Sequence, residues 1–233
     1  MIRSFVWRKD FRLASLWVAL TMAAATENLR GQTGPALARW EADISAFEAA
    51  DKTNPPPQGA VLFVGSSSIR LWKTLAADFP DHPVINRGFG GSQLIDSVTF
   101  ADRIVLPCQP KMILLYAGDN DIAAKKTPSQ VLTDFRLFAQ KVHQKLPETR
   151  IGFIAIKPSL ARWSLIEPIK EANRLVKVYC QENERLLFID VFPLMLDADG
   201  QPRSDLLAAD GLHLNRKGYE LWMALIKPHL PKP

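Results

Sequence analysis

Short apolar runs that alternate with longer helical patterns constrain the fold of this chain more than any other feature of its sequence. The runs lie at 60–64, 84–86, 112–116, 151–156 and 186–191, and several lack the apolar–polar alternation of a half-exposed strand. Strands have this character when helices cover both faces of a parallel sheet. Helix-like stretches follow the runs at 69–78, 93–101, 128–146, 165–184 and 216–227. The repetition of strand and helix predicts an open α/β sheet.

The length of the chain suits one domain of this kind. Its 233 residues are 47% hydrophobic and 23% charged, which is the balance of a globular protein and too little chain for two ordinary domains. We expect the α/β domain to occupy 59–233. The segment 26–58 before it reads as a linker and a helix, with apolar residues spaced by three and four up to a run of prolines.

The first 25 residues have the features of a secretory signal peptide. Four Lys and Arg residues lie within the first twelve, and the apolar run 13–25 ends in small residues. This run is too short for a comfortable membrane span, and no second apolar stretch suggests one. We therefore expect an exported protein, periplasmic or secreted. The alternative is an N-terminal amphipathic helix on a cytoplasmic protein.

Charge and cysteine content exclude some functions. The net charge of +5 is scattered, without the concentrated basic face that binds nucleic acid. Two cysteines, Cys108 and Cys180, do not make a disulfide framework or have metal-ligand spacing. We expect two separate buried thiols, although an exported protein could pair them.

The loop after the first apolar run contains three serines, Ser66, Ser67 and Ser68. In open α/β sheets, ligands bind beyond the carboxyl ends of the strands. A serine at a strand-to-helix turn lies where backbone N–H groups and the helix dipole favour negative charge. A plain helix N-cap is the alternative. The loop is neither a P-loop nor a Gly-x-Ser-x-Gly elbow.

Three glycines, Gly88, Gly90 and Gly91, lie close together after the second run. Glycines permit positive φ and close backbone approach, so this loop could direct an N–H at a bound oxyanion. A tight turn that needs glycine for its shape alone is the alternative. The spacing does not match a dinucleotide-binding fingerprint.

The loop after the third run places Asn120 between Asp119 and Asp121. It could present an asparagine that polarises a carbonyl, flanked by structural carboxylates. A cation site and an Asx-turn are the alternatives.

The last polar loop contains Asp210 and His213, ahead of the final helical stretch. An aspartate three residues before a histidine can reach the imidazole and hold its tautomer. The alternative is a helix start capped by Asn215, with His213 on the polar surface. The other histidines, His82, His143 and His229, have no comparable neighbours.

In this order, the four loops resemble the consensus blocks of the SGNH, or GDSL-type, hydrolase family over about 60–227. The platelet-activating-factor-acetylhydrolase-like esterases are the most similar, because they share the Asn-x-Gly-x-Gly-Gly run. The resemblance assigns Ser67 as nucleophile, Gly91 and Asn120 to the second and third blocks, and Asp210 and His213 to the last. Ser66 stands where the family usually has aspartate, and this leaves Ser66 as a rival nucleophile.

The resemblance implies a fold and a reaction. The fold is a three-layer α/β/α sandwich with a five-stranded parallel sheet of the flavodoxin-like kind. The reaction is the hydrolysis of short-chain acyl esters, acetyl esters in particular, through a Ser67–His213–Asp210 triad and an acyl-enzyme. The oxyanion hole would consist of the Ser67 N–H, the Gly91 N–H and the Asn120 amide, and no cofactor or metal is needed.

The partner expected from this resemblance is a small-molecule or carbohydrate ester, with neither nucleic acid nor stable membrane insertion. Arg162 and Trp163 follow the fourth run and could line its site; a tryptophan that only anchors packing is the alternative. Two other functions remain open: a non-catalytic SGNH-like protein that binds carbohydrate or lipid, and an acyltransferase. A flavodoxin-like cofactor module would need a phosphate-binding first loop. The sequence carries no indication of the oligomeric state.

Overall fold

The computed structural model describes residues 38–232. The expected leader, 1–25, and most of the linker lie outside the described residues. The sheet, the helices that cover it and the candidate site all belong to one unit, residues 43–233.

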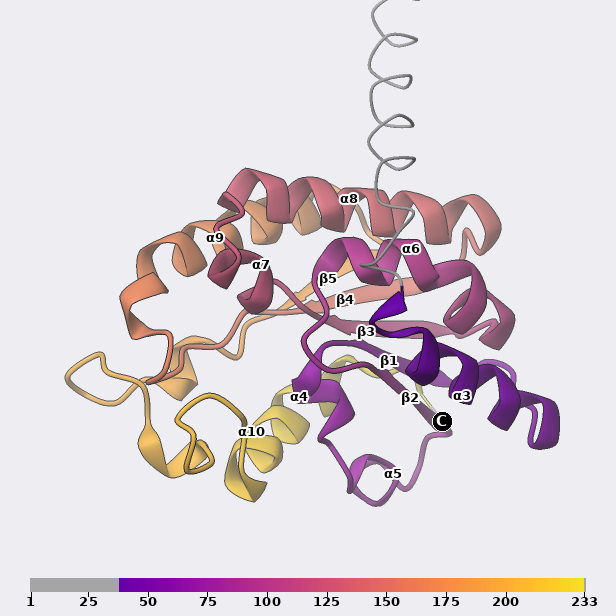
Figure 1. Ribbon diagram of the computed structural model, residues 1–233, viewed down its shortest axis with the longest axis horizontal. Coiled ribbons are helices and arrows are strands. Elements are labelled where there is room, and N and C mark those ends of the chain that lie inside the picture. Colours follow the sequence, from indigo (N-terminus) through magenta and orange to yellow (C-terminus); the bar gives the residue numbers. More distant parts are fainter. Residues whose placement is uncertain (1–37, 233) are drawn as a thin grey trace, which may run out of the picture. The chain divides into compact units, whose positions relative to one another are not determined.

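Five parallel strands form the sheet, in the order β2-β1-β3-β4-β5 (Figure 1). Their bounds are β1 Val61–Gly65, β2 Val84–Gly88, β3 Met112–Tyr116, β4 Arg150–Ile154 and β5 Leu186–Ile189. The central strands β1 and β3 are buried along their whole length, as expected for strands covered on both faces. This order confirms the predicted flavodoxin-like sheet.

Helices cover both faces of this sheet, so the predicted three layers are confirmed. Figure 1 shows α6, α8 and α9 over one face, and α4, α5 and α10 over the other. The α-helices are α3 Glu41–Thr53, α4 Ser67–Arg70, α5 Leu75–Asp78, α6 Leu94–Ile104, α7 Asp119–Ala123, α8 Pro128–Lys145, α9 Ile166–Gln181 and α10 Arg216–Ile226. Short 3₁₀ helices are η1 Leu106–Cys108, η2 Trp163–Leu165, η3 Pro193–Met195, η4 Ser204–Leu206 and η5 Lys227–His229. Among the described residues, no helix is long and apolar enough to cross a bilayer.

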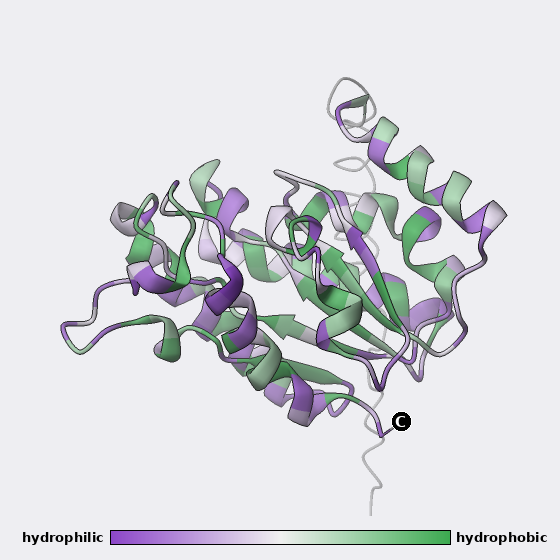
Figure 2. Ribbon diagram, turned by 90° about the horizontal axis from the view of Figure 1, so that it is seen from below, coloured by the Kyte–Doolittle hydropathy of each residue, from purple (hydrophilic) through white to green (hydrophobic). Residues whose placement is uncertain are grey.

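Hydrophobic residues are buried on both faces of the sheet. Figure 2 shows apolar strands at the centre and helices that combine hydrophobic and hydrophilic residues. Trp222, a buried residue of α10, packs 4.8 Å from Tyr116 and 6.2 Å from Trp72, measured between ring centroids. Cys108 and Cys180 are free and buried, which confirms the prediction of two separate thiols. Burial raises the pKa of Cys180 to about 12.

Two expectations about the elements were wrong in detail. The stretch 69–78 is not one helix, because α4 ends at Arg70 and α5 begins at Leu75. The intervening turn buries Trp72, whose Nε1–H donates to the Asp78 carboxylate at 2.7 Å. The apolar runs also extend beyond the ends of β4 and β5, because Ala155, Ile156 and Val191 are buried in the loops that follow.

Candidate active site

The serine loop leaves the sheet through a turn that requires glycine. Gly65, the last residue of β1, is level with Gly88 of β2 and Tyr116 of β3, so three loops begin at one edge of the sheet. Gly65 has φ of +133°, and a Cβ there would lie 1.9 Å from the Tyr116 carbonyl oxygen. The Ser66 N–H instead donates to that oxygen at 3.0 Å. The chain then enters α4 with Ser67 as its first residue.

Ser67, His213 and Asp210 lie in a continuous chain of contacts. Ser67 Oγ lies 3.0 Å from His213 Nε2, and His213 Nδ1 lies 2.6 Å from Asp210 Oδ2. The other carboxylate oxygen, Oδ1, accepts the N–H groups of Leu212 and His213, each at 2.9 Å. Hydrogen bonds from the His213 ring, the His213 N–H and the Leu212 N–H hold the pKa of Asp210 below its ordinary value.

This arrangement determines which ring nitrogen carries the proton. An ionised Asp210 only accepts hydrogen bonds, so the proton of a neutral His213 ring lies on Nδ1. The lone pair of Nε2 then faces Ser67 Oγ and can accept its hydroxyl proton. The three side chains therefore have the geometry for activation of a serine nucleophile.

The helix-cap interpretation of the last loop is compatible with this arrangement. Asn215 Oδ1 accepts the Gly218 N–H at 3.1 Å and caps α10. Its amide donates to the carbonyls of Asp205 and Leu207, both at 2.9 Å. Since the Ala208 N–H also donates to the His213 carbonyl at 2.8 Å, the loop holds His213 in place from both sides.

Ser66 differs from Ser67 in its environment. Its side chain is fully buried, and its hydroxyl has no hydrogen-bond partner among the described residues. It occupies the N-cap position of α4 but makes no side-chain cap. The contact with a histidine is made by Ser67, which favours Ser67 over its neighbour.

The expected oxyanion-binding groups lie on the adjoining loops. Within residues 38–232, no hydrogen bond is formed by the N–H of Ser67 or of Gly91. Gly91 has φ of +77°, the left-handed conformation that its loop was expected to need. Asn120 Nδ2 donates to the Ser92 carbonyl at 3.0 Å, which brings Asn120 next to this glycine loop.

Arg162 lies on the other side of Asn120. Its Nη2 donates to Asn120 Oδ1 at 2.8 Å, and its Nη1 lies 3.0 Å from Asp119 Oδ2. Trp163, the other expected lining residue, begins η2 and is half-buried; none of the site's hydrogen bonds among the described residues involves its side chain.

The sequence offered no signal for a buried lysine behind this cluster. Lys157 is 2% exposed, and its Nζ lies 3.9 Å from Asp119 Oδ2 and 6.0 Å from the centroid of the Tyr116 ring. Burial lowers the pKa of Lys157. Asp119 thus faces two cationic side chains.

Asp121, the second carboxylate of the third loop, has a structural environment. Both of its oxygens accept the Leu94 N–H at 3.2 Å, and Oδ1 lies 3.2 Å from Lys126 Nζ. These bonds connect the loop to the start of α6. Among the described residues, no three His, Cys, Asp or Glu side chains lie close enough together to hold a metal ion.

The serine helix α4 and the helix α10, which follows the histidine loop, are joined directly. The Tyr219 hydroxyl of α10 donates to the Ser68 carbonyl of α4 at 2.9 Å. The Tyr219 ring also packs 4.9 Å from that of Trp72. These contacts place the histidine loop against the serine helix.

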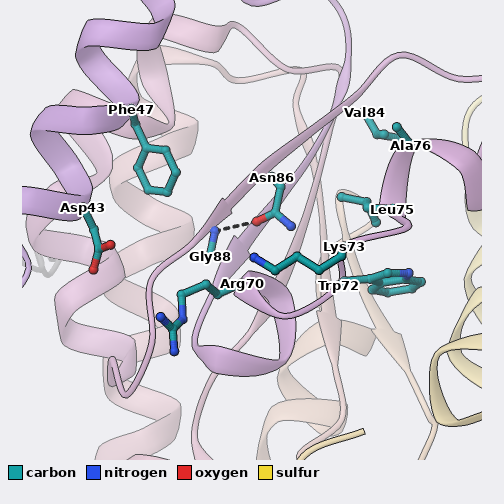
Figure 3. Close-up of a pocket in the computed structure, with 10 residues that line it drawn as sticks. All are labelled: Asp43, Phe47, Arg70, Trp72, Lys73, Leu75, Ala76, Val84, Asn86 and Gly88. Carbon is teal, nitrogen blue, oxygen red and sulfur yellow. Dashed lines mark hydrogen bonds between the residues drawn. The ribbon is translucent and has the colours of Figure 1, made fainter. Parts of the chain in front are cut away.

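A separate pocket of about 550 Å³ lies along the outer edge of β2 (Figure 3). Phe47 and Asp43 of α3 line one side, and Arg70 and Lys73 line another. None of the predicted site residues is among those that line it.

Comparison with known proteins agrees with the fold and the motifs. The model of the GDSL-like Lipase/Acylhydrolase family matches residues 57–221. No functionally curated protein matches the chain significantly in sequence.

Solved structures share the fold at low sequence identity. A Streptococcus pneumonia protein described as a candidate platelet activating factor is 22% identical, with a TM-score of 0.74, and the match covers 90% of this chain and 99% of that one. A GDSL-like lipase from Bacteroides thetaiotaomicron is 18% identical, with a TM-score of 0.68, covering 81% and 97%. A mutant of an acetyl-xylooligosaccharide esterase from Geobacillus Stearmophilus is 15% identical, with a TM-score of 0.61, covering 73% and 94%.

Proposed function

Because the chain belongs to the GDSL-like lipase/acylhydrolase family, and is thereby a carboxylic ester hydrolase, we propose that it cleaves short-chain acyl esters through an acyl-enzyme on Ser67. The observation that carries this proposal is the continuous contact from Asp210 through His213 to Ser67 Oγ. No comparable contact between a serine and a histidine side chain occurs elsewhere among the described residues.

Acylation begins with proton transfer. His213 Nε2 takes the hydroxyl proton as Ser67 Oγ attacks the ester carbonyl, and the Asp210 carboxylate stabilises the imidazolium that forms. The carbonyl oxygen becomes an oxyanion, which the N–H groups of Ser67 and Gly91 and the Asn120 amide bind. The imidazolium then donates its proton to the ester oxygen, the C–O bond breaks and the alcohol leaves.

Deacylation repeats these steps with water. His213 Nε2 takes a proton from a water molecule, whose oxygen attacks the acyl carbonyl on Ser67. Collapse of the second tetrahedral intermediate returns the proton to Ser67 Oγ and releases the carboxylic acid. The dipole of the first turn at Ser67 adds favourable positive potential at the oxyanion in both steps.

Acetyl esters, including those on sugars, are the substrates that we propose. The support is the likeness to the acetyl-xylooligosaccharide esterase and to a structure described as an acetyl esterase mutant with acetate ion. The match covers 94% of that esterase chain, so the likeness extends over nearly all of it.

The deciding experiment measures p-nitrophenyl acetate hydrolysis by the wild type, Ser67→Ala and Ser66→Ala, with a fluorophosphonate label located by mass spectrometry. We expect Ser67→Ala to lose turnover and labelling, while Ser66→Ala keeps both. A wild type that neither turns over nor labels would favour the carbohydrate- or lipid-binding alternative. Competition with sugar acceptors separates hydrolysis from acyl transfer.

We also propose that residues 1–25 direct export. The support is the basic start followed by a short apolar run that ends in small residues. Fractionation of expressing cells, with N-terminal sequencing of the product, tests it. Full-length protein confined to the cytoplasm would contradict export.

A further inference from the structure

The Asn120 amide is held from two sides by groups of opposite hydrogen-bonding character. On one side, Nδ2 donates to the Ser92 carbonyl oxygen at 3.0 Å. On the other side, Oδ1 accepts from Arg162 Nη2 at 2.8 Å. A carbonyl oxygen can only accept and a guanidinium can only donate, so each neighbour admits one orientation of the amide.

Rotation of the amide by 180° would break both contacts. Oδ1 would then face the Ser92 carbonyl, and Nδ2 would face the Arg162 guanidinium. Both encounters are repulsive, and they leave the four groups without their hydrogen bonds. The observed orientation leaves the second hydrogen of Nδ2 as the donor available to an oxyanion.

Arg162 is itself held in place. Its side chain is 18% exposed, and Nη1 lies 3.0 Å from the Asp119 carboxylate, whose Oδ1 accepts the Asn120 N–H at 2.9 Å. The planar guanidinium thus spans the side chains of two successive residues of one loop. A lysine ammonium is a point charge and lacks this fork.

The segment that carries Arg162 is also fixed to the histidine loop. The Ala161 N–H donates to the Gly211 carbonyl at 3.0 Å, and Gly211 lies between Asp210 and His213. A Cβ on Gly211 would lie 3.2 Å from Leu160, so the two loops pack closely. Arg162 therefore reaches Asn120 from a loop that is bonded to the triad loop.

We propose that Arg162 is a positioning residue, whose guanidinium sets the Asn120 amide so that Nδ2–H faces the oxyanion. The inference rests on the proposed esterase function. The cationic hydrogen bond to Oδ1 also polarises the amide and makes Nδ2–H a stronger donor. This role differs from direct substrate binding by Arg162, because it acts on the transition state through Asn120.

A double-mutant cycle on p-nitrophenyl acetate tests this role, with Arg162→Ala, Asn120→Ala and the double variant. We expect Asn120→Ala to lower kcat by about 10²–10³-fold and Arg162→Ala by roughly 10–100-fold, with KM nearly unchanged. In the Asn120→Ala background, removal of Arg162 should cost less than about twofold, because the amide that it positions is gone.

Two further variants separate positioning from folding. Arg162→Lys should recover part of the kcat lost in Arg162→Ala, and added guanidinium ion should raise the kcat of Arg162→Ala without raising that of Asn120→Ala. Arg174→Ala removes an arginine that is paired with Glu171 on the exposed face of α9, and it should keep wild-type kcat. Thermal melting of every variant identifies any that is unfolded. If Arg162→Ala does not fold, the kcat of Arg162→Lys is compared with that of the wild type instead.

Some results would overturn the inference. Additive losses in the double variant, or a raised KM with unchanged kcat, would make Arg162 a direct substrate contact. An unchanged kcat in Arg162→Ala would leave it without a role. Failure of the proposed function is distinct, because it shows as a wild type without turnover or as a Ser67→Ala variant that keeps it.

Discussion

Arg216 donates to both carboxylate oxygens of Asp78, with Nη1 2.8 Å from Oδ2 and Nη2 2.7 Å from Oδ1. The Asp78 side chain is 5% exposed, and it also accepts from Trp72 Nε1 and Thr74 Oγ1. Arg216 is the first residue of α10, which follows His213, whereas Asp78 is the last residue of α5, which follows the serine helix α4 along the chain. The pair therefore joins the two parts of the chain that also meet in the Ser67–His213 contact.

Replacing Arg216 by Met should destabilise the fold by about 1–3 kcal/mol, because the buried Asp78 carboxylate loses its charged partner. Urea unfolding measures the change. Glu220→Ala is the matched control: it removes only an exposed pair with Arg216 and should change the free energy of unfolding by less than about 1 kcal/mol.

The loss of unfolding free energy caused by Arg216→Met should depend on pH. Burial alone would raise the pKa of Asp78, but hydrogen bonds from Arg216, Trp72 and Thr74 outweigh it and lower the pKa to about 2. A depressed folded-state pKa gives stability that is present above the unfolded value of 3.8 and is lost as the pH falls toward 2. The gap between wild type and variant should therefore narrow from pH 5 to pH 2, and a constant gap would contradict this account.

Asp121 should make the free energy of unfolding change with pH in the opposite direction. Burial raises its pKa from 3.8 to about 6, although Lys126 and the Leu94 N–H partly oppose this rise. A raised folded-state pKa gives stability that is full below the unfolded value and is lost as the pH rises through the folded one. The free energy of unfolding should fall by up to about 3 kcal/mol between pH 4 and pH 6. Asp121→Asn should remove this slope, and an identical slope in both proteins would refute the assignment.

Asp210→Asn should lower kcat by about 10²–10⁴-fold without a large change in melting temperature. An asparagine amide no longer requires the Nδ1–H tautomer of His213, and it stabilises an imidazolium less than a carboxylate does. Because half of the Asp210 side chain is exposed, solvent screens its charge, and the loss should fall short of that for Ser67→Ala. Steady-state kinetics measures the ratio; equal activity of variant and wild type would remove Asp210 from the mechanism.

Gly91→Ala should lower kcat by roughly 10–100-fold, because an L residue at φ of +77° displaces the N–H proposed to bind the oxyanion. Gly200 provides a control, because it has φ of +73° and a Cβ added there would meet no atom within 4 Å. Both alanine variants should lose about 1 kcal/mol of stability from backbone strain. Only Gly91→Ala should lose activity, so equal kcat in the two variants would argue against a role for its N–H.

Much of the fold followed from the sequence, because strands buried on both faces are apolar throughout and parallel strands place their loops at one edge. The assignment of Ser67, Asn120 and His213 to one site came from the resemblance to the family's blocks, and loop spacing alone did not show that these loops converge. The prediction of one helix over 69–78 was wrong, because the hydrophobic periodicity did not reveal the buried turn at Trp72.

The contact between Arg162 and Asn120 could not be predicted. The two residues are 42 positions apart, in loops without a shared pattern. The same applies to Lys157, because a lysine at the end of an apolar run gives no sign of burial. Spacing identifies residues on one element, whereas partners on different loops depend on how the loops pack.

Ser67 and His213 are separated by 146 residues, almost the whole length of the domain. During synthesis, the proposed nucleophile is therefore made long before its proposed base. A nascent or prematurely ended chain carries Ser67 without the histidine that is proposed to activate it. The proposed reaction therefore requires α10 and the histidine loop to be in place against the serine helix, and its rate reports the molecules in which they have docked.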